Sequence, residues 1–260
     1  MPETLEIERV AGVATIWMNR PERHNAFNAM VIAELDAAFA ELDSDAELRV
    51  IVLAGRGKSF SAGADLNWMK AAGEASVADN HADAMRLARL FERIATCRKP
   101  TVARVHGAAL GGGMGLACAC DICIAGEHAV FATSEVRFGL VPATIGPYVV
   151  RAIGERQAYR YFQSAERIDA VHAVEIGIAH QAVADDALDD TVLAQVDALL
   201  AGGPLAQAAA KDLIRAVVHR PVDEALLADT ADRIAGLRAT PEAREGLAAF
   251  LDKRRPGWQS

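Results

Sequence analysis

The spacing of apolar residues in the first half of the chain changes repeatedly from a strand period to a helix period. Residues 5–10 and 13–18 alternate around a glycine turn, which predicts a β-hairpin. Residues 28–42 place apolar side chains at helical spacing behind a capping asparagine, and residues 49–54 have the pattern of a buried strand. The order of strand, loop and helix returns over residues 101–125. Such repetition favours a parallel α/β core.

The second half of the chain has a different pattern. From about Gly146 onward the apolar spacing is almost entirely helical, and three prolines predict breaks between helices: Pro204, Pro221 and Pro241. We therefore expect two units. Residues 1–195 form an α/β core that holds the ligand site, and residues 196–260 form a C-terminal helical subdomain.

Composition and charge narrow the class of protein. The chain has 260 residues, of which 52% are hydrophobic and 24% charged, as in ordinary globular proteins. Its formal net charge of −8 argues against nucleic-acid binding, which draws affinity from clustered Lys and Arg. The acidic start does not resemble a signal peptide, and the longest apolar run, residues 107–120, is shorter than the ~20 residues that span a bilayer. We expect a cytoplasmic protein that does not enter a membrane.

Three of the four cysteines lie close together, at Cys118, Cys120 and Cys123. No second pair of Cys or His follows at a distance typical of zinc sites, and the neighbouring residues are apolar. We expect buried free thiols and no metal site.

Two glycine-bearing segments carry the candidate chemistry. Residues 60–66 (Phe-Ser-Ala-Gly-Ala-Asp-Leu) and 107–115 (Gly-Ala-Ala-Leu-Gly-Gly-Gly-Met-Gly) each follow an apolar, strand-like run. Loops of this kind can close on a ligand, and two convergent backbone N–H groups can hold an oxyanion. A Walker loop would need glycine where Val52 stands, and a dinucleotide fingerprint would need glycine or alanine where Cys118 stands. Tight turns and close helix packing are the structural alternative for such glycines.

Together with their surroundings, these segments resemble the crotonase superfamily, that is, the enoyl-CoA hydratase/isomerase family. The resemblance extends to residues 19–26, 120–122, 135–142 and 245–254, and so covers nearly all of the chain. It implies a crotonase-like spiral of repeated βα (ββα) units with a C-terminal helical trimerisation subdomain. It also implies a homotrimer or a hexamer, an acyl-CoA thioester as substrate, and no cofactor, since coenzyme A is part of the substrate.

The resemblance assigns the catalytic groups residue by residue. The two oxyanion-hole amides fall on Ala64 and Gly112, and an acid/base glutamate falls on Glu135. A second glutamate that is usual in the family's hydratases falls on Gly115, where no acid is possible. A single glutamate is the pattern of the family's double-bond isomerases. However, residues 135–150 resemble bacterial methylglutaconyl-CoA-type hydratases, in which the same glycine replacement occurs.

Three functions therefore stay open. The first is hydration of an α,β-unsaturated acyl-CoA, such as 3-methylglutaconyl-CoA, and the second is Δ3-Δ2-enoyl-CoA isomerisation. The third is a non-catalytic acyl-CoA-binding or RNA-binding relative. The acidic pI of about 5.4 counts against RNA, and the presence of Glu135 counts against an inert binder.

The resemblance also predicts how the substrate is bound. The coenzyme A nucleotide is expected near Arg23, His24, Ala26, Asp65 and Leu66. Phe250 and Lys253, expected on one face of a C-terminal helix, would reach the coenzyme A of a neighbouring subunit. The substrate pocket is assigned to Trp68, Met69 and Gly115, with the polar residues 71–83 as a mobile wall.

Overall fold

The computed structural model describes residues 2–259, whose strands form two sheets. The larger sheet has the order β1-β2-β3-β4-β6-β9. Its strands are β1 (Leu5–Val10), β2 (Val13–Met18), β3 (Val50–Gly55), β4 (Thr101–Val105), β6 (Ile122–Gly126) and β9 (Gln181–Val183). The pair β1–β2 is antiparallel and every other neighbouring pair in this sheet is parallel. The predicted hairpin and the predicted parallel core are thus confirmed.

A second, three-stranded sheet has the order β5-β7-β8 and was not predicted from the sequence. Its strands are β5 (Ala108–Leu110), β7 (Val130–Ala132) and β8 (Ile168–Asp169). They are only two or three residues long, which is too short for a two-residue period to stand out. This sheet matters for the site because β5 leads directly into the second glycine segment.

Both faces of the larger sheet are covered, and strand β3 shows how. Ile51 and Leu53 point into the main hydrophobic cluster, together with residues of α1 (Ala29–Ser44), α3 (Val77–Thr96), α4 (Gly112–Ala119) and α5 (Gly146–Ser164). Val50 and Val52 point to the other face, where α7 (Leu188–Leu200) packs on β3, β4 and β6. A strand buried on both faces reads as a continuous apolar run, as residues 50–54 do.

The remaining short elements connect these layers. They are the 3-10 turns η1 (Pro21–Arg23), η2 (Glu135–Phe138), η3 (Asp185–Ala187) and η4 (Gly257–Gln259) and the helices α2 (Leu66–Glu74) and α6 (Ala170–Glu175). The polar residues 71–83 fall largely within α2 and α3. The Ser76 hydroxyl accepts from the Asp79 amide at 3.1 Å and so caps the start of α3.

The cysteines are free thiols, as predicted, and burial raises the pKa of Cys118 to about 12.

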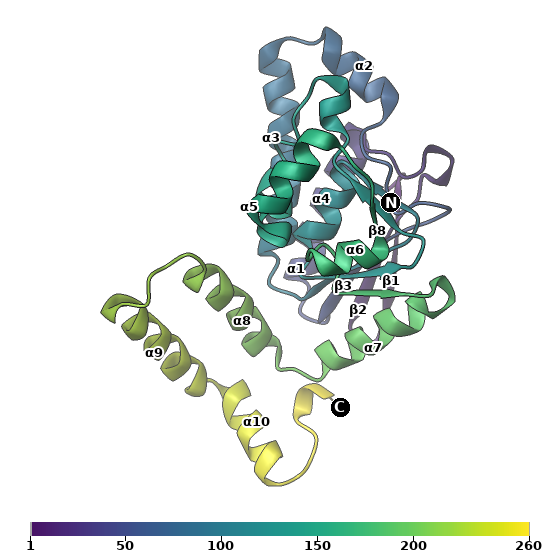
Figure 1. Ribbon diagram of the computed structural model, residues 1–260. Coiled ribbons are helices and arrows are strands. Elements are labelled where there is room, and N and C mark those ends of the chain that lie inside the picture. The colour runs from purple at the N-terminus through teal and green to yellow at the C-terminus, as the bar shows by residue number, and fades with distance from the viewer. Residues whose placement is uncertain (1, 260) are drawn as a thin grey trace.

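The last three helices are α8 (Pro204–Val217), α9 (Glu224–Arg238) and α10 (Pro241–Leu251). Figure 1 shows them leading away from the α/β core. Pro204 and Pro241 occupy first turns and Pro221 lies between α8 and α9, so the predicted breaks are confirmed. Residue 195 falls within α7, which packs on the sheet. Within residues 2–259, no helix combines the length and the apolar character needed to cross a bilayer.

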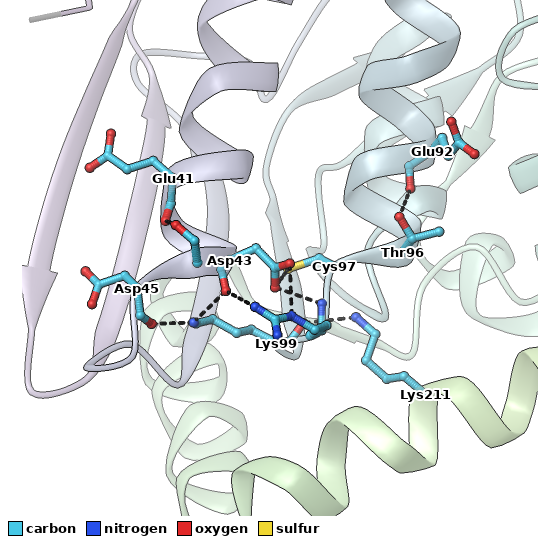
Figure 2. Close-up of polar contacts among 10 residues, drawn as sticks. Glu41, Asp43, Asp45, Glu92, Thr96, Cys97, Lys99 and Lys211 are labelled. Carbon is cyan, nitrogen blue, oxygen red and sulfur yellow. Dashed lines mark hydrogen bonds and ion pairs between the residues drawn. The ribbon is translucent and has the colours of Figure 1, made fainter.

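The helical arm is attached to the core through α8. The Lys211 ammonium donates to the Lys99 carbonyl at 2.9 Å, as Figure 2 shows, and to the Asp121 carboxylate at 2.6 Å. Beside it, the Asp43 carboxylate accepts from the Arg98 amide at 2.9 Å and from the Cys97 thiol at 3.3 Å (Figure 2). The first helix of the arm is therefore tied to the segments that follow α3 and α4, and Asp43 ties the end of α1 to the same segment after α3.

Candidate active site

The two glycine segments lie side by side. The Ser61 amide donates to the Ala108 carbonyl and the Leu110 amide donates to the Ser61 carbonyl, both at 2.9 Å. Gly63 has a φ of 90°, and a Cβ placed on it would lie 2.9 Å from the Leu110 carbonyl oxygen. Only glycine allows this backbone conformation at such a close approach.

The amides of Ala64 and Gly112 are both left free by the surrounding backbone. Phe27 pairs with the residues on either side of Ala64, because its amide donates to the Gly63 carbonyl and its carbonyl accepts from the Asp65 amide, each at 2.7 Å. Gly112 is the first residue of α4, where helical N–H groups have no internal partner. Within the described range, neither amide donates to another residue. Both can therefore donate to a ligand.

Glu135 lies at the junction of the two loops. A Cβ placed on Gly111 would be 3.2 Å from Oε1 of Glu135 and 4.0 Å from the Cα of Gly63. The carboxyl thus lies beside Gly111, the residue before the free amide of Gly112, and Gly111 in turn lies beside Gly63, the residue before Ala64. An acidic group here can reach a substrate atom while both amides hold the adjacent oxygen.

Helix α5 fixes the segment that carries Glu135. The Thr133 hydroxyl donates to the Tyr161 carbonyl at 3.0 Å, and the Arg137 guanidinium donates to the Ala165 carbonyl at 2.8 Å. Both acceptors lie at the end of α5. The position of the carboxyl is therefore set by a helix and not by a free loop.

The environment of Glu135 favours its protonated form. Burial raises the pKa of this carboxyl from its ordinary value of 4.5, although the amides of Glu135 and Ser134 act in the opposite direction. Its Oε2 atom is buried and has no hydrogen-bond partner among residues 2–259. A carboxyl that titrates nearer to neutral pH can both accept and return a proton.

The space beside the Cα of Gly115 is filled by apolar side chains. Gly115 follows Gly111 by one helical turn, and its amide donates to the Gly111 carbonyl at 3.0 Å. A Cβ on Gly115 would lie 2.8 Å from the Cβ of Ile145 and 3.1 Å from Cε1 of Phe91. These side chains occupy the space that a second carboxyl at position 115 would need.

The five residues predicted to bind the nucleotide lie on two segments that bond to each other. Arg23, His24 and Ala26 belong to η1 and the residues just after it, while Asp65 caps α2 and Leu66 begins it. The His24 carbonyl accepts from the Ala62 amide at 2.9 Å. Burial would raise the pKa of Asp65, but hydrogen bonds from the Asn67 amide and the Arg20 guanidinium outweigh this and lower it.

The predicted pocket residues Trp68 and Met69 are half-buried on the first turns of α2. Nε1 of Trp68 is buried without a hydrogen-bond partner in the described range. Phe250 is 80% exposed near the end of α10, far along the chain from these residues.

The prediction that Phe250 and Lys253 share a helix face is wrong, because α10 ends at Leu251. Lys253 has a φ of 53°, its amide donates to the Phe250 carbonyl, and the Arg254 amide donates to the Ala249 carbonyl. This pair of bonds is a Schellman motif, which reverses the chain after a helix. Lys253 therefore leaves the face on which Phe250 lies.

Three residues that support the site were not predicted: Arg20, Asn25 and Phe27. Asn25 is buried at a φ of 54° and donates to the carbonyls of Arg56 and Ser59. The ring of Phe27 packs against Gly112, where a Cβ would lie 2.9 Å from Cδ2. The only sequence signal was their place in or beside residues 19–26, which the family resemblance had matched.

Comparison with known proteins agrees with this geometry. The family model described as Enoyl-CoA hydratase/isomerase matches residues 8–260. A solved enoyl-CoA hydratase from Shewanella pealeana is 42% identical, covers 99% of this chain and 96% of its own, and superimposes with a TM-score of 0.96. The solved structure of Pseudomonas aeruginosa AtuE is 37% identical, with coverage of 99% and 100% and a TM-score of 0.95. The 2,3-dehydroadipyl-CoA hydratase of Escherichia coli is 32% identical over 256 residues, which are 98% of each chain.

The α/β core with its helical arm is therefore the crotonase fold. The chain belongs to the enoyl-CoA hydratase/isomerase family, and it is an enzyme of the enoyl-CoA hydratase class.

Proposed function

We propose that the protein adds water across the double bond of an α,β-unsaturated acyl-CoA. The observation that carries this proposal is the meeting of Glu135 with the free amides of Ala64 and Gly112. The thioester oxygen accepts from both amides, and the carboxyl lies beside the carbons that react. Each donor in comparable oxyanion holes contributes about 3–4 kcal/mol to the transition state.

Glu135 carries the proton in both halves of the reaction. Its carboxylate removes a proton from water while the water oxygen bonds to the β-carbon, and the π electrons move through the α-carbon onto the thioester oxygen. The Ala64 and Gly112 amides stabilise this enolate. The protonated Glu135 then returns the proton to the α-carbon on the same face, so that one water is added in total.

We place the substrate among β-branched glutaconyl-CoA esters such as 3-methylglutaconyl-CoA. Two observations support this choice. Residues 135–150 resemble hydratases of that type, and the substrate in the name of the Escherichia coli relative, 2,3-dehydroadipyl-CoA, carries the acyl group of a diacid. Because Ile145 and Phe91 fill the space beside Gly115, the distal carboxylate of the substrate would take part in holding the water. A Glu135→Gln variant that keeps full hydratase activity would refute this mechanism.

Isomerisation of a 3-enoyl-CoA is the second candidate, and the single carboxyl favours it. In that reaction Glu135 removes a proton from the α-carbon and returns it to the γ-carbon, through the same enolate. No activated water is needed.

One assay distinguishes the two reactions. The enzyme is incubated separately with crotonyl-CoA, 3-methylglutaconyl-CoA and a 3-enoyl-CoA, and the absorbance of the conjugated thioester is followed. Loss of absorbance with either conjugated substrate means hydration, and fastest loss with 3-methylglutaconyl-CoA supports the substrate assignment. A gain with the 3-enoyl-CoA, without any loss with the other two, would replace hydration by isomerisation.

The proposal includes the nucleotide site and the assembly. Arg23 and His24 with the backbone of Ala26, Asp65 and Leu66 would hold the coenzyme A nucleotide. A homotrimer, or a hexamer built from two trimers, would bring Phe250 and Lys253 to the coenzyme A of a neighbouring subunit. The exposed apolar side chains on α8–α10 support such an assembly, since they need a partner to be covered.

A further inference from the structure

Residues 20–27 form a clasp around the loop that carries the Ala64 amide. Three backbone hydrogen bonds join the two segments: Ala62 donates to His24 at 2.9 Å, Phe27 donates to Gly63 at 2.7 Å, and Asp65 donates to Phe27 at 2.7 Å. The last two bonds flank Ala64 on both sides. The orientation of its amide therefore depends on where this clasp lies.

The Arg20 guanidinium ties the clasp to the loop. Nη1 donates to the Ala26 carbonyl at 2.7 Å, and Nη2 donates to the Asp65 carboxylate at 3.1 Å. The Arg20 side chain is 17% exposed and that of Asp65 is 10% exposed, so this ion pair is much less screened than a surface pair. Arg20 thus links the residue before Phe27 to the residue after Ala64.

Asp65 extends the link to the next helix. Its Oδ1 accepts from the Asn67 amide at 2.9 Å and so caps α2. The guanidinium reaches two acceptors through its planar fork, which a lysine ammonium cannot reproduce with the same geometry.

We propose that Arg20 is a positioning residue that makes binding of the coenzyme A nucleotide hold the Ala64 amide in its catalytic orientation. The inference rests on the proposed function, which places the nucleotide on Arg23, His24 and Ala26 of the same clasp and on the backbone of Asp65 and Leu66. A ligand that fixes Arg23, His24 and Ala26 also fixes Phe27 and, through Arg20, the carboxylate of Asp65. Binding energy from a remote part of the substrate then appears in kcat and not only in KM.

The base of the clasp is held independently of the Arg20 side chain. Asn25 donates to the carbonyls of Arg56 and Ser59 at 2.9 and 2.8 Å, and its carbonyl accepts from the Ser61 hydroxyl at 2.8 Å. Its side-chain oxygen accepts from the Arg20 backbone amide at 2.9 Å, which any residue at position 20 except proline retains. An Arg20 variant is therefore expected to keep the fold while it loses the link to Asp65.

The experiment is a cycle of two changes, one in the enzyme and one in the substrate. Steady-state rates of the full chain, Arg20→Gln and Arg20→Lys are measured with the same acyl group on coenzyme A and on pantetheine, which lacks the nucleotide. With the unchanged enzyme, pantetheine is expected to lower kcat as well as raise KM. In Arg20→Gln, kcat with the coenzyme A thioester should fall about tenfold, as expected for ~1.4 kcal/mol of lost positioning, and kcat with the pantetheine thioester should change less than threefold.

Two further variants, Asp65→Asn and Arg9→Gln, test whether the loss comes from the ion pair between Arg20 and Asp65. Asp65→Asn keeps an acceptor for the α2 cap but removes the charge that Arg20 pairs with, so it should reproduce the selective loss. Arg9→Gln, which breaks an exposed ion pair between Arg9 of β1 and Glu41 of α1, should leave all the rates unchanged. Arg20→Lys should lie between the unchanged enzyme and Arg20→Gln.

The possible failures can be told apart. If Arg20→Gln lowers kcat by the same factor with both thioesters, or leaves kcat unchanged with both, Arg20 does not couple the nucleotide to the amide and the inference is overturned. If the unchanged enzyme turns over none of the three acyl-CoA substrates, the proposed function itself is overturned.

Discussion

At the scale of single residues, Glu135 combines a cost in stability with a gain in reactivity. Because burial raises its pKa above the ordinary 4.5, the folded protein is destabilised relative to the unfolded chain as pH rises through the folded pKa. Glu135→Gln removes this charge, so the variant should unfold at a higher temperature than the unchanged enzyme at pH 8. The difference should vanish below about pH 4, where the carboxyl is protonated in both states.

The same substitution should lower kcat by roughly 10²–10⁴-fold, because in the proposed mechanism Glu135 is the group that transfers the proton. Thermal unfolding followed across pH, together with rates on the coenzyme A thioester, tests both effects. A matched change at an exposed carboxyl, Glu41→Gln, should alter neither. Equal melting temperatures of Glu135→Gln and the unchanged enzyme at pH 8 would mean that the carboxyl is well solvated.

Gly115 shows why a second glutamate cannot simply be restored. Gly115→Glu would drive its side chain into Ile145 and Phe91, and overpacking of this kind costs about 1–3 kcal/mol. Urea denaturation should show that loss, and the double variant with Ile145→Ala should recover part of it. A single Gly115→Glu variant as stable as the unchanged protein would show that the apolar wall yields easily.

At the scale of elements, local patterns predicted what depends on local sequence. The hairpin, the parallel strands and the proline breaks all follow from short-range spacing, and the structure has each of them. The short strands of the second sheet do not, because a run of two or three residues shows no two-residue period. The glycine segments could be recognised because their signal lies in a few consecutive residues. The role of Phe27 between Gly63 and Gly112 could not be recognised, because it depends on residues distant in the chain.

The end of α10 gives a similar lesson about boundaries. Spacing alone placed Phe250 and Lys253 on one face, but a lysine at a φ of 53° ended the helix first. Helix ends depend on which carbonyls find partners, and side-chain spacing carries little of that information.

The clasp around the oxyanion loop should also be sensitive to its one buried amide side chain. Asn25→Ala leaves the Arg56 and Ser59 carbonyls without a donor and puts alanine at a φ of 54°, so it should cost about 2–4 kcal/mol of stability. Asn25→Gly relieves the backbone strain but not the lost hydrogen bonds, and should cost less. Chemical denaturation of both variants separates the two contributions. Equal costs would mean that strain at position 25 is negligible.

At the scale of the whole molecule, the helical arm exposes apolar surface that the core does not cover. The exposed side chains include Leu205, Ile214, Leu247, Phe250 and Leu251. The arm is not loose at its base, since Lys211 joins α8 to Asp121 and to the Lys99 carbonyl. A well-anchored helical unit with an apolar surface is what a subunit interface requires.

If the chain forms a trimer through this surface, disrupting the surface should affect both assembly and substrate binding. Leu247→Asp combined with Leu251→Asp places charges on the apolar surface of α10, and should shift the molar mass measured by light scattering toward that of a monomer. If Phe250 completes the coenzyme A site of a neighbour, KM for the coenzyme A thioester should rise at the dilutions at which the assembly dissociates. Val10→Asp, an equally exposed apolar position on β1, is the matched control and should change neither quantity. If the assembly dissociates and KM does not change, the proposed interface is supported but the proposed role of Phe250 is not. The coenzyme A site would then be complete within one chain.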